Sequence, residues 1–212
     1  MTPFRSQEIR HKGGVYYGVN AVSHNLILCN REELLNGNGF ILGVSGSGKS
    51  FAAKQEITSI ALGTDHDIIV VDPEREYGSL IHALGGEVIA ISANTSNHIN
   101  ALDISAEYGE GSNPLVLKSE FVMSLCQQLQ HGPIEPGDKS IIDRCLEHIY
   151  EDYLKTYEGN APTLLDLYYD LLKQPEPEAH RLALALELFA KGSLNVFAHQ
   201  TNVNTKARII SY

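Results

Sequence analysis

The sequence predicts an α/β fold in which a parallel sheet is flanked by helices and carries an all-α insertion. Three observations predict this fold class. A glycine-rich loop lies between an apolar run and a helical pattern in residues 40–62. Two further apolar runs, at 67–72 and 87–91, alternate with helical patterns, as parallel strands do. Residues 114–191 contain successive helical patterns with no strand between them.

The glycine-rich loop is the most specific feature of the chain. From Gly43 to Ser50 it reads Gly-Val-Ser-Gly-Ser-Gly-Lys-Ser, which matches the phosphate-binding (Walker A) pattern G-x-x-x-x-G-K-[ST]. Glycines let the backbone wrap closely around phosphates, while the backbone amides and the start of the next helix favour negative charge. The pattern therefore predicts a P-loop nucleotide triphosphatase with a RecA-like sheet.

Each part of the loop has an expected role. Lys49 is expected to reach the β- and γ-phosphates as a catalytic residue, and the Ser50 hydroxyl is expected to ligate Mg²⁺. ATP is preferred over GTP, because the chain has no Asn-Lys-x-Asp signature for guanine. The residues expected to contact the nucleotide are Gly43, Val44, Ser45, Gly46, Ser47, Gly48, Lys49, Ser50 and Phe51.

Short strands are expected on the N-terminal side of the loop. Residues 14–20 and 25–29 are predicted to be two short strands of a hairpin, joined through Ala-Val-Ser-His at 21–24. Residues 36–39, Asn-Gly-Asn-Gly, form a turn by composition, and Phe40-Ile41-Leu42 reads as a buried strand that leads into the loop.

The core is expected to continue with alternating helices and strands. Residues 51–62 predict a helix that ends at Gly63. Residues 68–71 are four consecutive β-branched residues, which indicate a strand buried on both faces. A short helix from Gly78 to Leu84 and a strand from Glu87 to Ile91 follow.

Asp72 ends the strand predicted at residues 68–71, at the edge where α/β proteins bind ligands. A P-loop enzyme needs an acidic residue on a second strand near Mg²⁺ and commonly a glutamate that activates water. Asp72, with Glu74 close by, is one candidate for this work. Against it, Pro73 interrupts the usual Asp-Glu pair, and the strand follows the P-loop helix at once. The alternative is an acidic motif beyond Tyr212.

Helical periodicity dominates the second half of the chain, and its apolar stripes are expected to pack as a core. Asp138 is expected to be an N-cap, and Thr163 with Asp166 resembles a capping box. Residues 206–212 begin like a strand, so the chain is expected to be a fragment. The predicted helices are 114–131, 138–157, 163–173 and 177–191.

Composition limits the function classes. The chain has 212 residues, is 43% hydrophobic and carries a formal net charge of −10. This acidity argues against a broad nucleic-acid surface, so DNA contact by this chain is not expected. Without a membrane-length apolar run or a signal segment, the chain is expected to be cytoplasmic. Its three cysteines form no CxxC pair and are expected to be reduced.

The order of the motifs resembles a known family. The loop is followed by Ile-Ile-Val-Val-Asp-Pro-Glu-Arg-Glu-Tyr at 68–77, Leu-Gly-Gly-Glu-Val-Ile at 84–89 and Ile-Asn-Ala-Leu-Asp at 99–103. This series is similar to the conjugative-transfer ATPases of type IV secretion systems, the VirB/TraC-like group of the HerA–FtsK superfamily. Within that group it resembles the ATPases of conjugative transposons. Ala101 departs from the Asn-Pro found in many relatives.

The resemblance implies the N-terminal part of a motor domain. The parent would be a Mg²⁺-dependent, hexameric ATPase that works with other subunits of a conjugative secretion complex at the inner face of the membrane. Asp72, Glu76 and Tyr77 would form a second-strand motif beside the nucleotide, with Glu76 and Asp72 as further catalytic candidates. The Mg²⁺-holding acid and an arginine that acts between subunits would lie downstream, so this chain is expected to hydrolyse ATP poorly or not at all.

Two alternatives stay open. One is a HerA/FtsK-like DNA-translocating motor or helicase, and the other is a non-enzymatic P-loop docking module, which has no physical need for an intact Gly-Lys-Ser. The expected domain limits are 1–39 for a lead-in and hairpin, 40–113 for the P-loop core, 114–191 for the all-α insertion and 192–212 for the return to the core.

Overall fold

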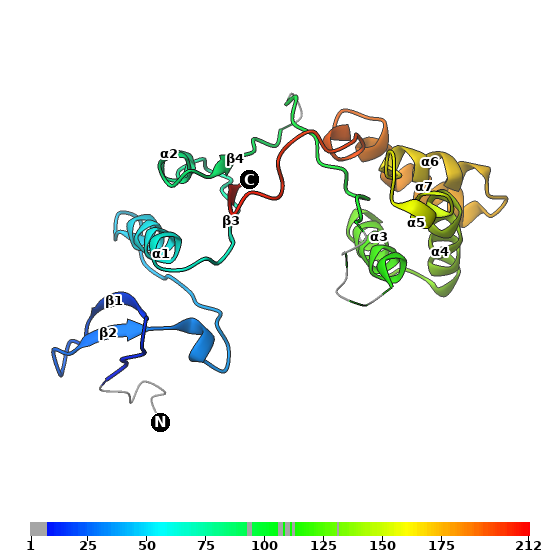
Figure 1. The fold of residues 1–212 in the computed structure, drawn as a ribbon. Helices are drawn as coiled ribbons and strands as arrows, with labels where there is room; N and C mark the ends of the chain where they lie inside the picture. The colour runs from blue at the N-terminus through cyan, green and yellow to red at the C-terminus, as the bar shows by residue number, and fades with distance from the viewer. Residues whose placement is uncertain (1–7, 93–94, 106–107, 109–110, 112, 131) are drawn as a thin grey trace. The chain divides into compact units, whose positions relative to one another are not determined.

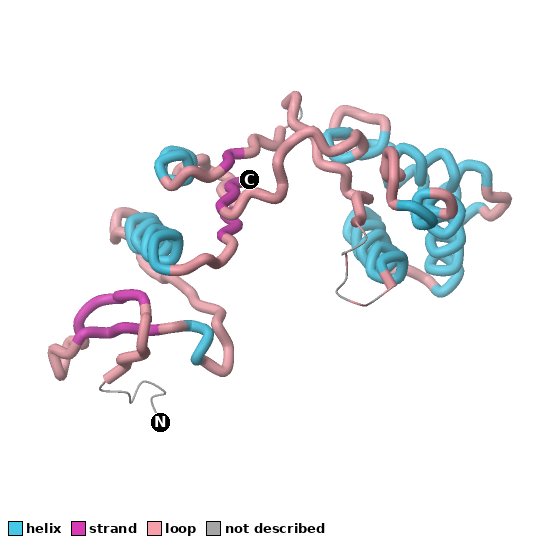
Figure 2. The backbone as a smooth tube through the Cα atoms, viewed as in Figure 1, coloured by secondary structure: helices cyan, strands magenta, loops and turns pink. Residues whose placement is uncertain are grey.

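The computed structural model describes residues 8–92, 95–105, 108, 111, 113–130 and 132–212. The chain divides into two compact units (Figure 1). The first unit contains residues 1–89 and 204–212, and the second contains residues 90–203. The first unit holds the hairpin, the glycine-rich loop and the parallel strands, and the second is helical (Figure 2).

The first unit begins with the predicted hairpin, which the structure confirms. Strand β1 (Val15–Val19) pairs antiparallel with β2 (Leu26–Cys29), and the register shifts between Tyr16 and Gly18. A short 3-10 helix, η1 (Arg31–Glu33), follows β2 directly.

A three-stranded parallel sheet confirms the predicted α/β class. Its strands are β3 (Ile68–Val70), β4 (Glu87–Val88) and β5 (Ile209–Ser211), in the order β3-β5-β4. The last strand of the chain is therefore the central one. Helices α1 (Lys49–Gly63) and α2 (Gly78–Ala83) contribute to an apolar cluster with the sheet. Its buried members are Ala61, Ile68, Ile81 and Ile209.

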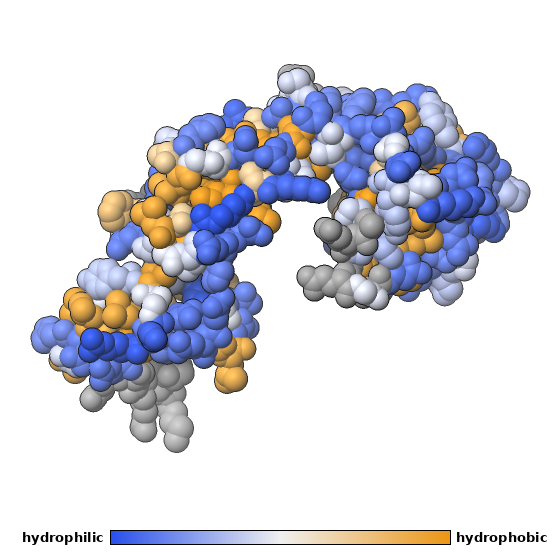
Figure 3. All heavy atoms as spheres, viewed as in Figure 1, coloured by the Kyte–Doolittle hydropathy of each residue, from blue (hydrophilic) through white to orange (hydrophobic). Residues whose placement is uncertain are grey.

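Two predictions about burial in this unit are wrong. Residues 40–42 form no strand, and Phe40 and Leu42 are 91% and 88% exposed, because no described strand pairs with them. The strand at residues 68–71 is not buried on both faces. Ile69 is 69% exposed and Val71 is 79% exposed, because in the described residues the apolar cluster covers only the side of Ile68. Figure 3 shows apolar surface, in orange, over parts of the molecule.

The second unit is built from helices around one apolar core. Buried residues of its four longest helices face a single cluster, which Leu102 and Ile104 also join. Leu102 and Ile104 precede the first long helix and pack in the same core. We therefore propose 90–203 as the extent of the helical subdomain. Its helices are α3 (Pro114–Gln130), α4 (Pro136–Tyr150), α5 (Tyr153–Thr156), α6 (Leu164–Lys173), α7 (Pro177–Ala190) and η2 (Asn195–Phe197).

One predicted helix start is confirmed and another is corrected. Thr163 and Asp166 form the capping box: Asp166 Oδ2 accepts from Thr163 N at 2.8 Å. Asp138 is not an N-cap, because α4 begins two residues earlier and Glu135 is its N-cap. Asp138 is fully buried, and its oxygens accept from Arg181 Nη2 at 2.5 and 2.7 Å. The carboxylate thus ties α4 to α7.

Lys118 is a buried cation in the same unit. Its Nζ donates to the carbonyls of Ala101 at 3.1 Å and Asp103 at 2.9 Å, and it lies 4.9 Å from the centre of the Tyr108 ring. Burial lowers the pKa of Lys118, while the charge of Asp103 opposes that change. Lys118 therefore holds the 101–103 turn against α3.

No helix among the described residues has the length and apolar character that a membrane crossing requires.

The cysteines provide a test of this packing. Cys126 and Cys145 are fully buried, and burial raises the pKa of each thiol to about 12. At pH 8 roughly one thiol in ten thousand would be ionised at such a pKa. A chromogenic disulfide reagent should therefore modify one thiol per native chain, the half-buried Cys29, and three thiols in urea. Rapid modification of more than one thiol in the native chain would contradict the described core.

Candidate functional site

The glycine-rich loop enters α1 through two glycines in left-handed conformations. Gly46 has φ of 78° and Gly48, the N-cap of α1, has φ of 89°. Side chains rarely adopt such angles, so glycine is the residue that this backbone path requires. A Cβ added at either position would meet no atom within 4 Å, so the loop is open on these sides. The amides of such a loop can point at one anion.

Lys49 folds back over the loop. Its Nζ donates to the carbonyl oxygen of Val44 at 2.9 Å, and Ser47 N donates to the same oxygen at 3.2 Å. The loop is close enough to itself that a Cβ on Gly43 would overlap Ser47 Oγ. A glycine-lined turn, a helix start and a lysine ammonium therefore meet at one place, which fits a phosphate group.

The remaining loop residues surround this turn. Ser50 is exposed and directly follows Lys49 on the first turn of α1, where a hydroxyl can ligate a cation held by phosphates. Val44, within the loop, and Phe51, directly after it, have largely exposed apolar side chains. The predicted nucleotide-binding residues thus form one continuous segment that is exposed except at the half-buried Lys49.

Asp72 has a defined structural environment. It is 7% exposed; its Oδ1 accepts from Glu76 N at 3.0 Å and its Oδ2 accepts from Tyr77 N at 2.8 Å. Asp72 N itself donates to Tyr212 O at 2.8 Å. Both carboxylate oxygens therefore hold the turn that leads into α2. This turn also contains Arg75 in a left-handed conformation, with φ of 58°.

The other two residues of the second-strand motif differ in their surroundings. Tyr77 lies beside α1, where Lys54 Nζ is 5.3 Å from the centre of its ring. The ring also packs on the apolar cluster of the sheet. Glu76 is exposed. The structure thus brings Tyr77 to α1, while the Asp72 carboxylate faces the backbone of its own turn.

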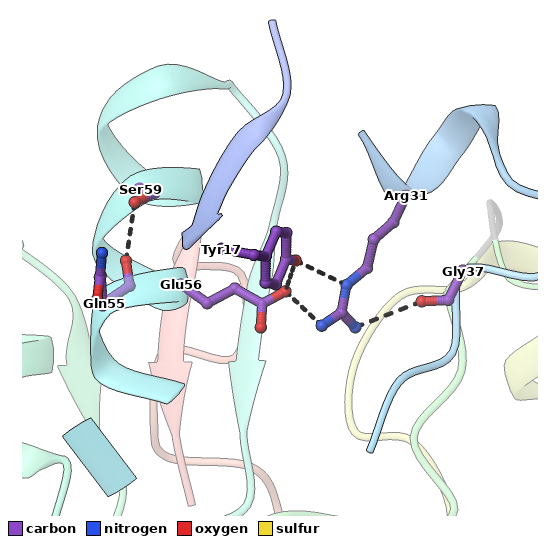
Figure 4. Close-up of polar contacts among 6 residues, drawn as sticks. All are labelled: Tyr17, Arg31, Gly37, Gln55, Glu56 and Ser59. Atoms are coloured by element: carbon purple, nitrogen blue, oxygen red, sulfur yellow. Dashed lines mark hydrogen bonds and ion pairs between the residues drawn. The ribbon is translucent and has the colours of Figure 1, made fainter. Parts of the chain in front are cut away.

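A polar cluster on α1 was not predicted from the sequence (Figure 4). Arg31 Nε donates to Tyr17 Oη at 2.9 Å, and Arg31 Nη2 lies 2.6 Å from Glu56 Oε1. Tyr17 Oη in turn donates to Glu56. Arg31 Nη1 donates to Gly37 O at 3.4 Å. These residues come from β1, η1, α1 and the turn before the loop, so no local pattern in the sequence could have joined them.

Electrostatics within this cluster follow from the geometry. Burial and the Glu56 carboxylate raise the pKa of Tyr17, while Arg31 opposes this. Burial alone would lower the pKa of Arg31, but its hydrogen bond to Tyr17 and the charge of Glu56 raise it. The cluster therefore holds a protonated phenol and a charged guanidinium on one carboxylate.

Comparisons with known proteins give a family and a fold. A family model described as the central domain of the helicase HerA matches residues 32–207. The solved structure of VirB4 of Thermoanaerobacter pseudethanolicus is similar, with a TM-score of 0.74 and 24% sequence identity. The match covers 96% of this chain and 57% of that one, so the chain spans little more than half of its relative. No curated protein gave a significant match.

The role of Asp72 can be tested through stability. Asp72→Ala removes the acceptor of two partly buried backbone hydrogen bonds, so the free energy of unfolding should fall by about 1–3 kcal/mol. Glu74→Ala is the control, since this carboxylate is exposed two residues away, and it should change the free energy by less than about 0.5 kcal/mol. Urea titration of both variants measures the difference. Equal stability of the two variants would show that the Asp72 hydrogen bonds are not what holds the turn.

Proposed function

The chain belongs to the family of the HerA helicase central domain, and we propose that it is the nucleotide-binding part of an ATP-driven motor. The observation that carries this proposal is the loop at residues 43–50, where two left-handed glycines precede a lysine at the start of α1. The shared fold with VirB4 agrees with it.

The loop has the groups that a triphosphate needs. The phosphates would replace the Val44 carbonyl as the partner of Lys49 Nζ, which exchanges a neutral acceptor for a charged one. Hydrogen bonds to charged groups contribute about 1.5–3 kcal/mol each, so this exchange favours binding. The backbone amides of residues 44–49 would hold the bridging and terminal oxygens. Mg²⁺ at Ser50 would neutralise charge on the β- and γ-phosphates.

Hydrolysis by this chain alone is proposed to be slow. Asp72 is one of the two acids that the second-strand motif offers, and both its oxygens accept backbone amides. Glu76, the other, is exposed on the turn before α2. We therefore propose that Lys49 and Ser50 serve binding here, and that the acid which activates water comes from elsewhere in the parent protein.

For the parent protein we propose a conjugative-transfer ATPase of a type IV secretion system. It would act as a hexamer, in contact with other subunits of the secretion complex, on the cytoplasmic side of the membrane. The likeness to VirB4 and the motif order at residues 43–50, 68–77, 84–89 and 99–103 support this assignment. Within this group, we propose that the parent protein is an ATPase of the conjugative-transposon type.

A DNA-translocating motor or helicase is the second candidate. The HerA description of the matching family favours it, while the net charge of −10 argues against DNA contact by this chain. Fluorescence anisotropy with labelled single- and double-stranded DNA separates the two. Tight binding that weakens steeply with salt would favour the second candidate.

Nucleotide binding is the direct test of the proposed function. Calorimetry with a non-hydrolysable ATP analogue should show Mg²⁺-dependent binding, and Lys49→Ala should weaken it at least tenfold, because a charged partner of the phosphates is lost. Lys54→Ala is the control, because it removes a lysine ammonium further from the N-terminus of α1. It should weaken binding less than about threefold. Absence of binding by the unaltered chain would overturn the proposal. Turnover of roughly 1 per second or faster that Lys49→Ala abolishes would contradict slow hydrolysis.

A further inference from the structure

The guanidinium of Arg31 touches the chain on both sides of the phosphate loop. On one side it lies 2.6 Å from Glu56, seven residues after Lys49 on α1. On the other side it donates to Gly37 O at 3.4 Å. Residues 37–56, which contain the whole loop, are thus closed into a ring by one side chain (Figure 4).

Gly39 makes the close approach on the N-terminal side possible. A Cβ at this position would lie 2.9 Å from Arg31 Nη1 and 3.0 Å from Nη2. The guanidinium therefore packs directly on the backbone four residues before Gly43. Gly37 differs, because a Cβ there would meet its nearest atom, Arg31 O, at 3.5 Å, which is ordinary contact.

Other contacts do little to hold the start of the ring. Residues 36–42 form no strand, and Phe40 and Leu42 are exposed. Within the part of the chain that the structure describes, Arg31 to Gly37 is the hydrogen bond that joins this segment to another element. Closing a flexible segment at both ends reduces the conformations that its loop samples. A loop with fewer conformations binds its ligand with less loss of entropy.

We propose that Arg31, held by Tyr17 and Glu56, is a positioning residue for the phosphate loop: it keeps residues 43–50 in the conformation that binds nucleotide. This inference rests on the proposed nucleotide binding. Arg31 acts through the backbone at residues 37–39 and through α1, and makes no contact with the nucleotide. Tyr17 fixes the guanidinium by accepting from Nε, so that Nη1 and Nη2 face the two flanks of the loop.

The test uses Gly39→Ala, with Gly37→Ala as its matched control. The added methyl at position 39 must displace the end of a flexible side chain, so the fold should survive while the guanidinium moves. We expect Gly39→Ala and Arg31→Gln each to raise the dissociation constant for a fluorescent ATP analogue with Mg²⁺ about three- to tenfold. Gly37→Ala should change it less than twofold. Adding Gly39→Ala to Arg31→Gln should cause no further loss, because both remove the same contact.

A second measurement separates positioning from general stability and from the proposed function. Hydrogen–deuterium exchange of the nucleotide-free chain should be faster at residues 40–48 in Gly39→Ala, with thermal midpoint and exchange in the helical unit unchanged. If the unaltered chain binds nucleotide but Gly39→Ala and Arg31→Gln bind equally well, the positioning role is overturned while the proposed function stands. If neither the unaltered chain nor any variant binds nucleotide, the proposed function fails. Unchanged hydrogen–deuterium exchange at residues 40–48 in Gly39→Ala would also overturn the positioning role.

Discussion

Pairing of β5 between β3 and β4 is the constraint on which the first unit depends. Ile68 N donates to Arg208 O at 2.8 Å, and Ile89 N donates to Ser211 O at 2.8 Å, so residues near the end of the chain join both neighbouring strands. The strands contain only two or three residues each, and β3 and β4 do not pair with each other. The helical segment between β4 and β5 leaves and rejoins the same sheet, and it packs around an apolar core of its own.

The glycine-rich loop at residues 43–50 runs directly into α1, so contacts that hold α1 also hold the end of the loop. Ala61 is the buried residue of this helix, so apolar packing secures mainly its C-terminal half. Arg208 donates to the carbonyls of Ala61, at 3.0 Å, and Thr64, which places a cation at the negative end of the helix dipole. Arg31 binds the middle of the helix through Glu56. Two arginines from distant parts of the sequence thus hold α1, while its positive N-terminus at Lys49 stays open to an anion.

Three carboxylates, those of Asp72, Asp138 and Asp170, are buried in the part of the chain that the structure describes. Asp72 organises the turn before α2, and Asp138 joins α4 to Arg181 on α7. Asp170 is buried and lies 2.8 Å from His148 Nδ1. Hydrogen bonds and charge pairing offset part of the cost of burying a carboxylate. At Asp170 only Oδ1 has such partners among the described residues, because the buried Oδ2 accepts no hydrogen bond. Each of these acids therefore has a structural role that is visible in the fold.

The sequence by itself determined the features that depend on neighbouring residues. The Gly-Lys-Ser loop, the hairpin, the capping box at Thr163 and the helical stripes follow from spacing and backbone preference, which act over a few residues. Only the tertiary structure decided where long-range contacts fall. It placed β5 in the centre of the sheet, left Phe40 and Ile69 exposed, and paired Asp138 with Arg181. It also brought Tyr17 of β1 and Arg31 of η1 to Glu56 of α1. Burial and ion pairing depend on which segments meet in space, and residues far apart in the chain carry no local signal of that meeting.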